Sequence, residues 1–455
     1  MVSECAIATL DHAPLEIVDG DRGVNYPTQA DFSSDGHCLF LNAKNVTAGG
    51  FDFSDCVFVS AEKDAKLRRG KLRRHDVVLT TRGTVGNVAY FDESVPHAHI
   101  RINSGMVILR ALRQELLPRY LYMFLRSSLF QAQVAFLCTG SAQPQLPIRD
   151  INRVEIPIPP PEEQHAIAHI LGTLDDKIEL NRRMNETLEA MARALFKSWF
   201  VDFEPVRAKA EGRDPDLPKA LADLFPDSFE DSEMGEIPEG WRVTVLGDVL
   251  TELETGGRPN GGVSGCVYGI PSIGAESIVG LGVFDYSKTK YVPQEFFDGM
   301  TKGRVQSRDV LLYKDGGRPG EFEPHLTLFG DGFPFDVCGI NEHVYRLRVK
   351  KEMGQHFLLF WLSSRLSMEE MRSRGTGVAV PGLNSTQVKS LTTLVPADRI
   401  TEAFDGLIDP WIARVLASCN ESRTLATLRD TLLPKLVSGQ LHVKDAERFI
   451  QEATA

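Results

Sequence analysis

The sequence lacks the features that define several large classes of protein. No run of about 18 apolar residues occurs, so no transmembrane helix is predicted. Residues 1–10 carry Glu4 and no basic residue before a short apolar stretch, which is not the pattern of a signal peptide. The seven cysteines are odd in number and never spaced CxxC, which argues against a disulfide framework and a zinc finger. We therefore expect a cytoplasmic protein without a metal site.

Motifs of several enzyme classes are also absent. A Walker A loop needs GxxxxGK[ST] to hold phosphates, and Gly70-Lys71 lacks both the upstream glycine and a following Ser or Thr. No GxGxxG opens a helix, and no Asn- or Asp-Pro-Pro-aromatic tetrapeptide of amino-methyltransferases occurs. Pro226-Asp227 is not followed by the Glu-x-Lys of a nuclease. We predict that the chain is not an enzyme by itself and holds no cofactor.

Positive charge is scarce and unevenly placed. The chain has 50 Lys and Arg against 62 Asp and Glu, a net charge of −12, which argues against a free-standing nucleic-acid binder. Residues 66–74 (KLRRGKLRR), however, hold six positive residues and no acid, whereas residues 220–240 hold seven acids and no Lys or Arg. The overall count hides this contrast, and the basic run remains compatible with nucleic-acid contacts.

The 455 residues form a tandem of two similar halves, with a period of 233 to 238 residues. Residues 70–79 align with 303–312, and residues 139–146 align with 376–383. In each half, apolar strands punctuated by Gly and Pro precede a short helix, a Gly-Pro loop and a long helix. Pro161, Glu162 and Glu163 favour the start of the first long helix.

Both long helices carry an apolar stripe at heptad spacing. Polar residues interrupt the stripes at matching places, Asn181 with Ser418 and Asn185 with Ser422. Such residues often fix the register of paired helices, which favours pairing over the alternative that each helix packs only on its own domain. The predicted pairing residues are Leu171, Leu174, Ile178, Asn181, Asn185, Leu188 and Leu195 in the first helix, and Trp411, Val415, Ser418, Ser422, Leu425 and Leu432 in the second.

Both helices are predicted to break at matching points, Gly172-Thr173 and Asp409-Pro410. From Pro410 to Leu433 is about 24 residues, or roughly 36 Å at 1.5 Å per residue. One turn of B-DNA is about 34–36 Å long. A rod of this length would hold two domains about one turn apart along a duplex.

Four segments identify a family. Residues 156–164 (IPIPPPEEQ), 194–209 (ALFKSWFVDFEPVRAK), 238–241 (PEGW) and 432–441 (LLPKLVSGQL), together with the tandem repeat, resemble the specificity subunit of type I restriction-modification enzymes over essentially the whole chain. The resemblance implies an α+β fold. Its two target-recognition domains, each mixed α/β, are joined by two long helices that form an antiparallel coiled coil with pseudo-two-fold symmetry.

The resemblance also implies a division of the chain. We expect target-recognition domain 1 at 1–159, helical spacer 1 at 160–205, a linker at 206–236, target-recognition domain 2 at 237–397, helical spacer 2 at 398–440 and a tail at 441–455. The linker is expected to contain one short helix, at 218–224. Phe196, Trp199 and Phe200 near the end of spacer 1 are expected in the core rather than on a docking surface.

The function that the resemblance implies is DNA sequence specificity. Each recognition domain reads one half of a split, asymmetric target in double-stranded DNA, and helix length sets the unread gap. Two modification (methyltransferase) subunits dock on the helices, and restriction subunits join them; S-adenosylmethionine, ATP and Mg are expected on these partners. Two alternatives remain: a self-contained DNA methyltransferase or nuclease with degenerate motifs, and a coiled-coil scaffold that does not bind DNA.

The candidate DNA-binding residues are mainly basic, because phosphate contacts require Lys and Arg. Ser, Gln and Gly in the loop at 139–145 add base-edge donors and acceptors and close reach. The alternative for the basic residues is a solvated charged face, and for the loop a structural turn. The candidates are Lys66, Arg68, Arg69, Lys71, Arg73, Arg74, Ser141, Gln143, Gln145, Lys302, Arg304, Arg308, Lys314, Arg318, Arg372 and Arg374.

Overall fold

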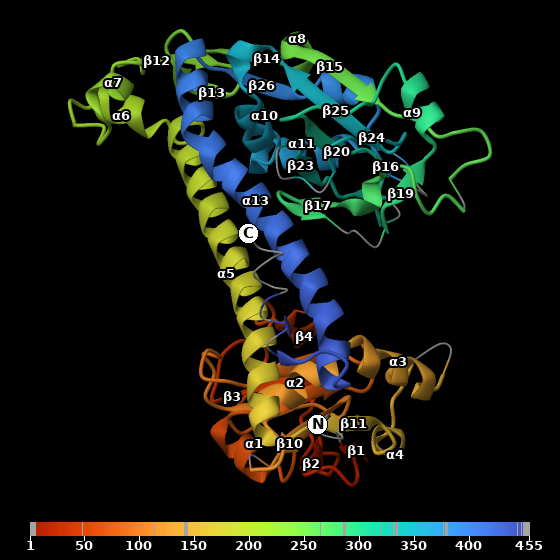
Figure 1. Cartoon of the computed structure of the whole chain (residues 1–455). Helices are drawn as coiled ribbons and strands as arrows, with labels where there is room; N and C mark the ends of the chain where they lie inside the picture. Colours follow the sequence, from red (N-terminus) through yellow and green to blue (C-terminus); the bar gives the residue numbers. More distant parts are fainter. Residues whose placement is uncertain are drawn as a thin grey trace. The chain divides into compact units, whose positions relative to one another are not determined.

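The chain forms two compact units in the computed structural model. The structure describes residues 6–448 except 48, 113, 141–143, 264, 285–287, 319, 331, 332, 334, 376, 378–380, 444 and 447. Unit 1 comprises residues up to 178 together with those from 424 onward, and unit 2 comprises residues 179–423. The long helices α5 (Pro161–Phe200) and α13 (Asp398–Val437) each contribute one segment to both units (Figure 1). None of the described helices combines the length and apolar character that a membrane span requires.

Unit 1 is built on a four-stranded antiparallel sheet in the order β2-β10-β7-β8. Its strands are β2 (Leu15–Asp19), β10 (Met106–Ala111), β7 (Val77–Thr80) and β8 (Val88–Tyr90). Smaller sheets pair β6 (Phe58–Val59), β3 (Cys38–Leu41) and β9 (Ile100–Ile102), β1 (Ala6–Thr9) with β11 (Glu155–Ile158), and β4 (Val46–Thr47) with β5 (Gly50–Phe51). The short helices are α1 (Ala61–Lys66), α2 (Pro118–Arg126), α3 (Ser128–Leu137) and α4 (Ile148–Ile151).

Unit 2 repeats this topology. Its four-stranded sheet is β15-β25-β20-β23, its three-stranded sheet is β19-β16-β24, and β14 pairs with β26 as β1 does with β11. The strands are β14 (Arg242–Val245), β15 (Leu250–Thr255), β16 (Ile270–Ile273), β17 (Ile278–Gly280), β18 (Val283–Phe284), β19 (Lys290–Val292), β20 (Val310–Tyr313), β21 (Gly317–Arg318), β22 (Glu321–Phe322), β23 (Leu326–Leu328), β24 (Gly339–Ile340), β25 (Val344–Val349) and β26 (Thr392–Val395). The short helices of this repeat are α8 (Leu246–Val249), α9 (Gln294–Gly299), α10 (Gln355–Leu362), α11 (Arg365–Arg374) and α12 (Ser385–Lys389).

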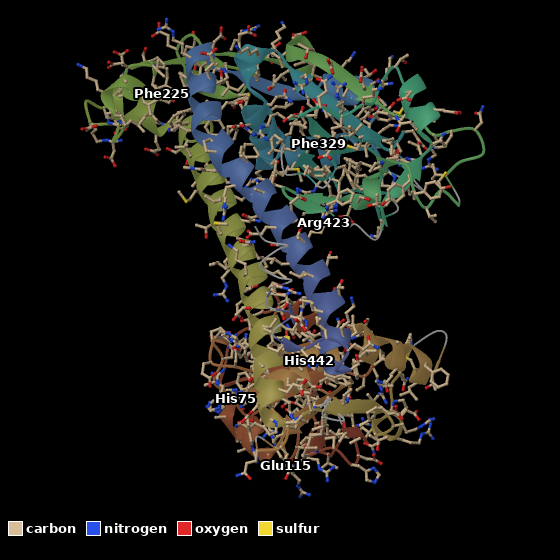
Figure 2. The ribbon with its side chains drawn as sticks, viewed as in Figure 1. His75, Glu115, Phe225, Phe329, Arg423 and His442 are labelled. Atoms are coloured by element: carbon tan, nitrogen blue, oxygen red, sulfur yellow. The ribbon has the colours of Figure 1, made fainter. Side chains whose placement is uncertain are left out.

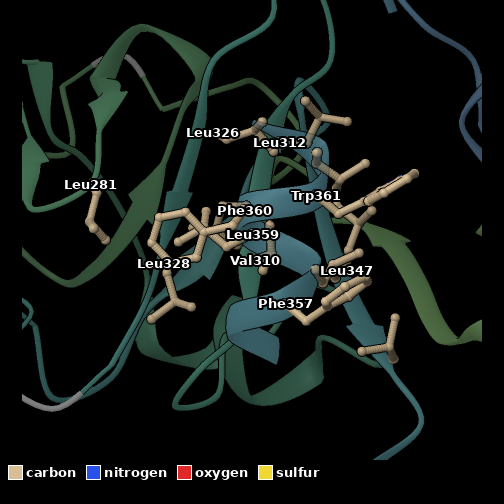
Figure 3. Packing of buried hydrophobic residues seen from close by; sticks show 14 of the residues in the cluster. Leu281, Val310, Leu312, Leu326, Leu328, Leu347, Phe357, Leu359, Phe360 and Trp361 are labelled. Atoms are coloured by element: carbon tan, nitrogen blue, oxygen red, sulfur yellow. The ribbon is translucent and has the colours of Figure 1, made fainter. Parts of the chain in front are cut away.

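The core of unit 2 shows why its central elements are apolar throughout. Helix α10 reads QHFLLFWL, and every residue after Gln355 is buried, which is the pattern of a helix enclosed on all sides. Figure 3 shows its aromatic side chains among leucines and valines of β20, β23 and β25. Phe196, Trp199 and Phe200 are also buried here, so the expectation that they lie in the core is confirmed.

The two long helices run without a break, so the predicted interruptions are wrong. Helix α5 continues through Gly172 and helix α13 through Pro410. Proline removes one backbone hydrogen bond within a helix and strains the turn before it. Ile408 and Ile412, on either side of Pro410, are 0% and 1% exposed in the core of unit 2. We attribute the continuity of α13 to this burial, which outweighs the loss of one hydrogen bond.

The stretch predicted as a linker contains more structure than one short helix. Helices α6 (Glu204–Ala210) and α7 (Lys219–Ala222) precede a hairpin of β12 (Phe229–Ser232) and β13 (Gly235–Pro238). Phe225 (labelled in Figure 2) and Ile237 are buried in the same core as Trp241, with Phe225 packed edge-on against Trp199. The apolar side chains of this acid-rich stretch therefore fold onto unit 2. The duplicated mixed α/β fold with two long helices confirms the predicted fold class.

Candidate nucleic-acid interface

The basic run at 66–74 connects helix α1 to the loop before β7. Arg68, Arg69 and Arg73 have exposed side chains. The Asp21 carboxylate accepts the backbone N–H groups of Arg68 and Arg69, at 2.7 and 3.4 Å, and fixes the turn that presents them. All three arginines line a groove of about 610 Å³, whose other walls include Asp19 and Arg110. This part of the run keeps its charge available for an anionic ligand.

The other basic residues of the run already have partners within unit 1. Lys71 and Arg101 both bind the buried carboxylate of Asp64, the latter at 2.5 Å. Burial acts to raise the pKa of Asp64, but these two hydrogen bonds outweigh it and lower the pKa to about 2. Arg74 donates to the carbonyl groups of Asp92 and Val95 and lies over the Phe91 ring. Lys66 pairs with Glu62 at the surface.

Most of the basic candidates in unit 2 are held by neighbouring residues. Arg308 Nε lies 2.7 Å from Asp409 Oδ1, and Arg372 Nη2 lies 2.6 Å from Glu323 Oε1. Arg304 donates to the Phe297 carbonyl, Lys314 lies 3.7 Å from Asp315, Arg374 binds Glu370, and Lys302 is exposed with no ion-pair partner among the described residues. Arg318 ends strand β21.

The loop candidates divide between described and undescribed residues. Ser141 and Gln143 lie outside the described residues. Gln145 is half-buried, and its backbone exchanges two hydrogen bonds of 2.9 Å with Thr139, which closes the base of the loop. Gly140 has φ 91°, a conformation that glycine adopts at low cost.

The predicted helix-pairing residues lie on the buried side of their helices within each unit. Leu171, Leu174, Leu425 and Leu432 are buried in the core of unit 1, with Ile178 packed against it. In unit 2, Val415 is buried, and Leu188, Leu195 and Trp411 pack against the core. The polar members form a separate layer there. Asn181 donates to Glu421, Ser422 and the Ser418 carbonyl at 2.9 to 3.4 Å, and Asn185 donates to Cys419.

A buried aspartate at the start of the central strand organises both repeats. Asp76, before β7, accepts hydrogen bonds from Arg110 on β10, and Asp309, before β20, accepts them from Arg346 and Arg348 on β25. The residue before each aspartate has a positive φ, 76° at His75 (labelled in Figure 2) and 67° at Arg308. The repeats therefore share a charged interior framework as well as a topology.

The structure brings together three loops that the sequence did not group. At the end of β7, the backbone N–H groups of Thr81 and Arg82 donate to the Gly105 carbonyl at 2.8 and 3.2 Å, and Leu146 donates to Thr81 at 3.0 Å. Arg82 also forms a β-bridge with Gln145. We call this meeting point the loop junction of unit 1, and Arg82 is exposed there. One signal for it was present in the sequence, since Gly83 aligns with Gly316 next to position 82, where the two repeats differ.

The loop junction has a counterpart in unit 2. Lys314 donates to the His343 carbonyl at 2.9 Å, Leu383 donates to Lys314 at 2.9 Å, and Asp315 forms a β-bridge with Gly382. The side chains of His343 and Asp315 are hydrogen-bonded at 2.9 Å. Burial, reinforced by the negative charge of Asp315, raises the pKa of nearby Tyr345 to about 12.

Comparisons with known proteins agree over most of the chain. Residues 23–190 match the model of the type I restriction modification DNA specificity domain. The type I restriction enzyme MjaIX specificity subunit of Methanocaldococcus jannaschii is 26% identical over 81% of this chain and 78% of its own length. The type I restriction enzyme HindI specificity subunit of Haemophilus influenzae is 24% identical over 93% of this chain and 98% of its own length.

A solved structure shares the fold. The crystal structure of the type I restriction-modification system S subunit from M. genitalium covers 95% of this chain and 96% of its own, with a TM-score of 0.54 and 16% sequence identity. At this level of identity, the likeness supports the arrangement of elements and not the roles of individual residues.

Proposed function

The chain belongs to the specificity subunits of type I restriction-modification enzymes, and we propose that it directs such a complex to a split, asymmetric sequence in double-stranded DNA. The observation that carries the proposal is the duplicated unit: two copies of one mixed α/β fold, attached to two long helices. Each copy reads one half of the target. Because the two copies differ in their exposed residues, the two half-sites differ in sequence.

The long helices set the gap between the half-sites in this proposal. Helices α5 and α13 each span 40 residues, and each takes part in both units. A helix rises about 1.5 Å per residue, so helix length translates directly into a distance along DNA. The gap is spanned and not read.

We further propose that the helices dock two methyltransferase subunits. On α5 of unit 2, a shallow hollow is lined by Arg183, Glu186, Thr187, Ala190, Met191 and Ala194, and Met191 is 46% exposed. The small side chains of Ala190 and Ala194 leave room for a partner helix beside the charged Arg183 and Glu186. The partners supply S-adenosylmethionine chemistry, and restriction subunits supply ATP- and Mg-dependent cleavage. The chain itself contributes specificity without catalysis, in the cytoplasm where the target DNA lies.

Methylation mapping tests the proposal directly. Cells would express the chain with the methyltransferase subunit encoded beside it, and separately each chain alone, and modified bases would be mapped by long-read sequencing. The expected result is one split, asymmetric methylated motif that requires both chains. Methylation by this chain alone would favour a self-contained enzyme, and the absence of sequence-specific DNA binding by the assembled complex would favour a scaffold.

A further inference from the structure

The two loop junctions share a backbone and differ in side chains. Hydrogen bond by hydrogen bond, Thr81 corresponds to Lys314, Arg82 to Asp315, Gly105 to His343 and Gln145 to Gly382. In both repeats an asparagine side chain, of Asn103 or Asn341, accepts the N–H of the residue two positions later, at 2.8 and 2.9 Å. The frame that carries the junction is therefore the same in both units.

An aspartate–arginine pair beside each junction is shared by the repeats, and unit 2 adds Arg346, which pairs with Asp309, Glu252 and Glu254 where unit 1 has Ile108. Asp76 and Asp309 occupy matching places, and so do their partners Arg110 and Arg348. At the junction itself, Arg82 of unit 1 corresponds to Asp315 of unit 2. A constant frame with variable tips is the arrangement that two modules need when they read different sequences with one architecture.

The Arg82 side chain is exposed, and it has no hydrogen-bond partner among the described residues. It differs in this from Lys71 and Arg74, which are held by neighbouring groups. Its backbone, by contrast, is fixed by the bond to Gly105 and the bridge to Gln145. An anchored backbone with an unengaged guanidinium suits a donor that must meet a base edge in a defined position.

We propose that the loop junctions are the base-reading sites, with Arg82 reading a guanine in one half-site and Asp315 an exocyclic amino group in the other. This inference rests on the proposed function. Arginine donates to the O6 and N7 acceptors of guanine in the major groove, whereas a carboxylate accepts from the amino group of cytosine. Lys314, 3.7 Å from Asp315, offsets the repulsion between its carboxylate and the phosphates, and the hydrogen bond to His343 orients that carboxylate, whose side chain is 24% exposed.

The opposite charges at matching positions make a specific prediction. At one position, the half-site read by unit 1 has a guanine. At the matching position, the half-site read by unit 2 has a base whose amino group donates a hydrogen bond. Exposed arginines 68, 69 and 73 then serve as phosphate contacts, which position the unit without selecting a sequence.

The test compares methylated motifs of complexes that carry the wild-type chain, Arg82→Gln or Asp315→Asn. Arg153→Ala is the control, since Arg153 is also an exposed arginine of unit 1, with its side chain 64% exposed, but follows helix α4 and is paired with Asp150. We expect Arg82→Gln to reduce discrimination at one base of one half-site by about tenfold or more, and Asp315→Asn to do so in the other half-site only. The control should leave the motif unchanged.

Several outcomes would overturn the assignment. An unchanged motif in Arg82→Gln would do so, as would relaxation in both half-sites. If Arg82→Gln abolishes methylation, a binding measurement tests the assignment instead. The assembled complex is titrated with duplexes that carry each of the four bases in turn at every position of the half-site. A loss confined to the wild-type base supports the assignment, and an equal loss for all four bases overturns it. A wild-type complex without a split motif would instead overturn the proposed function, and this inference with it.

Discussion

At the scale of single residues, the clearest lesson is that a basic side chain is not automatically a DNA contact. Asp64 is 4% exposed and binds both Lys71 and Arg101, so part of the basic run serves the fold of unit 1. In unit 2, Arg308 and Arg372 are likewise paired with carboxylates. The exposed residues Arg68, Arg69, Arg73, Arg82 and Lys302 keep their charge for a ligand.

The buried Asp64 gives a prediction about stability and pH. Its pKa falls from an ordinary value of 3.8 to about 2 in the folded chain, so its ion pairs stabilise the fold above pH 4 and are lost as pH falls toward 2. Asp64→Asn should lower the free energy of unfolding of unit 1 by about 2 kcal/mol at pH 7. Urea unfolding monitored between pH 7 and pH 2 should show this difference shrinking below pH 4.

The control for this prediction is an aspartate outside the core. Asp55 is 70% exposed and lies 3.6 Å from Lys44, a surface pair of little energetic weight. Asp55→Asn should leave the unfolding curve unchanged. The free energy of unfolding of wild type and Asp64→Asn could instead differ by the same amount down to pH 2. That result would contradict the prediction, because it would mean that the asparagine fails to supply the shape of Asp64 and not its charge.

At the scale of elements, the polar layer between the helices of unit 2 is a device for register. Asn181 is fully buried and donates to residues of α13, yet within the described part of the chain its Oδ1 has no hydrogen-bond partner, and neither does Ser418 Oγ. Polar residues at such positions fix alignment at a cost in stability. Asn181→Leu should therefore raise the free energy of unfolding by about 1 kcal/mol, measured by calorimetry of the purified chain.

The half-buried Asn185 provides the comparison for Asn181. It donates to Cys419 and to no other residue that the structure describes, and its Oδ1 also lacks a partner there. Because its side chain is half-buried and not fully buried, Asn185→Leu should raise stability by less than Asn181→Leu. A marked loss of stability in Asn181→Leu would contradict the prediction, and would mean that the amide network is a net source of stability.

The elements that could be predicted from sequence are those written into local pattern. The tandem repeat follows from shared residues such as Gly70 and Gly303, and the long helices follow from their apolar stripes. The β12–β13 hairpin was missed because its outward positions are acidic and only Phe229 and Ile237 mark its apolar side. The loop junctions escaped prediction because backbone hydrogen bonds join residues far apart in sequence, such as Thr81 and Leu146.

At the scale of the whole molecule, duplication explains how an acidic chain can still direct binding to DNA. Each unit needs only a small set of exposed donors and acceptors on a fixed frame, because partner subunits carry the chemistry in the proposed complex. A net charge of −12 then reflects the surface as a whole and not the reading sites. Because the two junctions differ in charge, the proposal predicts an asymmetric target.

The proposed ruler predicts what a change in helix length does to the target. Inserting one heptad into both α5 and α13 at the border between the units, near residues 178 and 423, preserves the facing of the apolar stripes. Seven residues add about 10 Å of helix, or about three base pairs of DNA. Methylation mapping should show both half-sites unchanged and the unread gap longer by about three base pairs.

An insertion in α5 alone is the control and should abolish methylation, because the stripes no longer match. An unchanged gap after the double insertion would mean that the helices do not set the spacing.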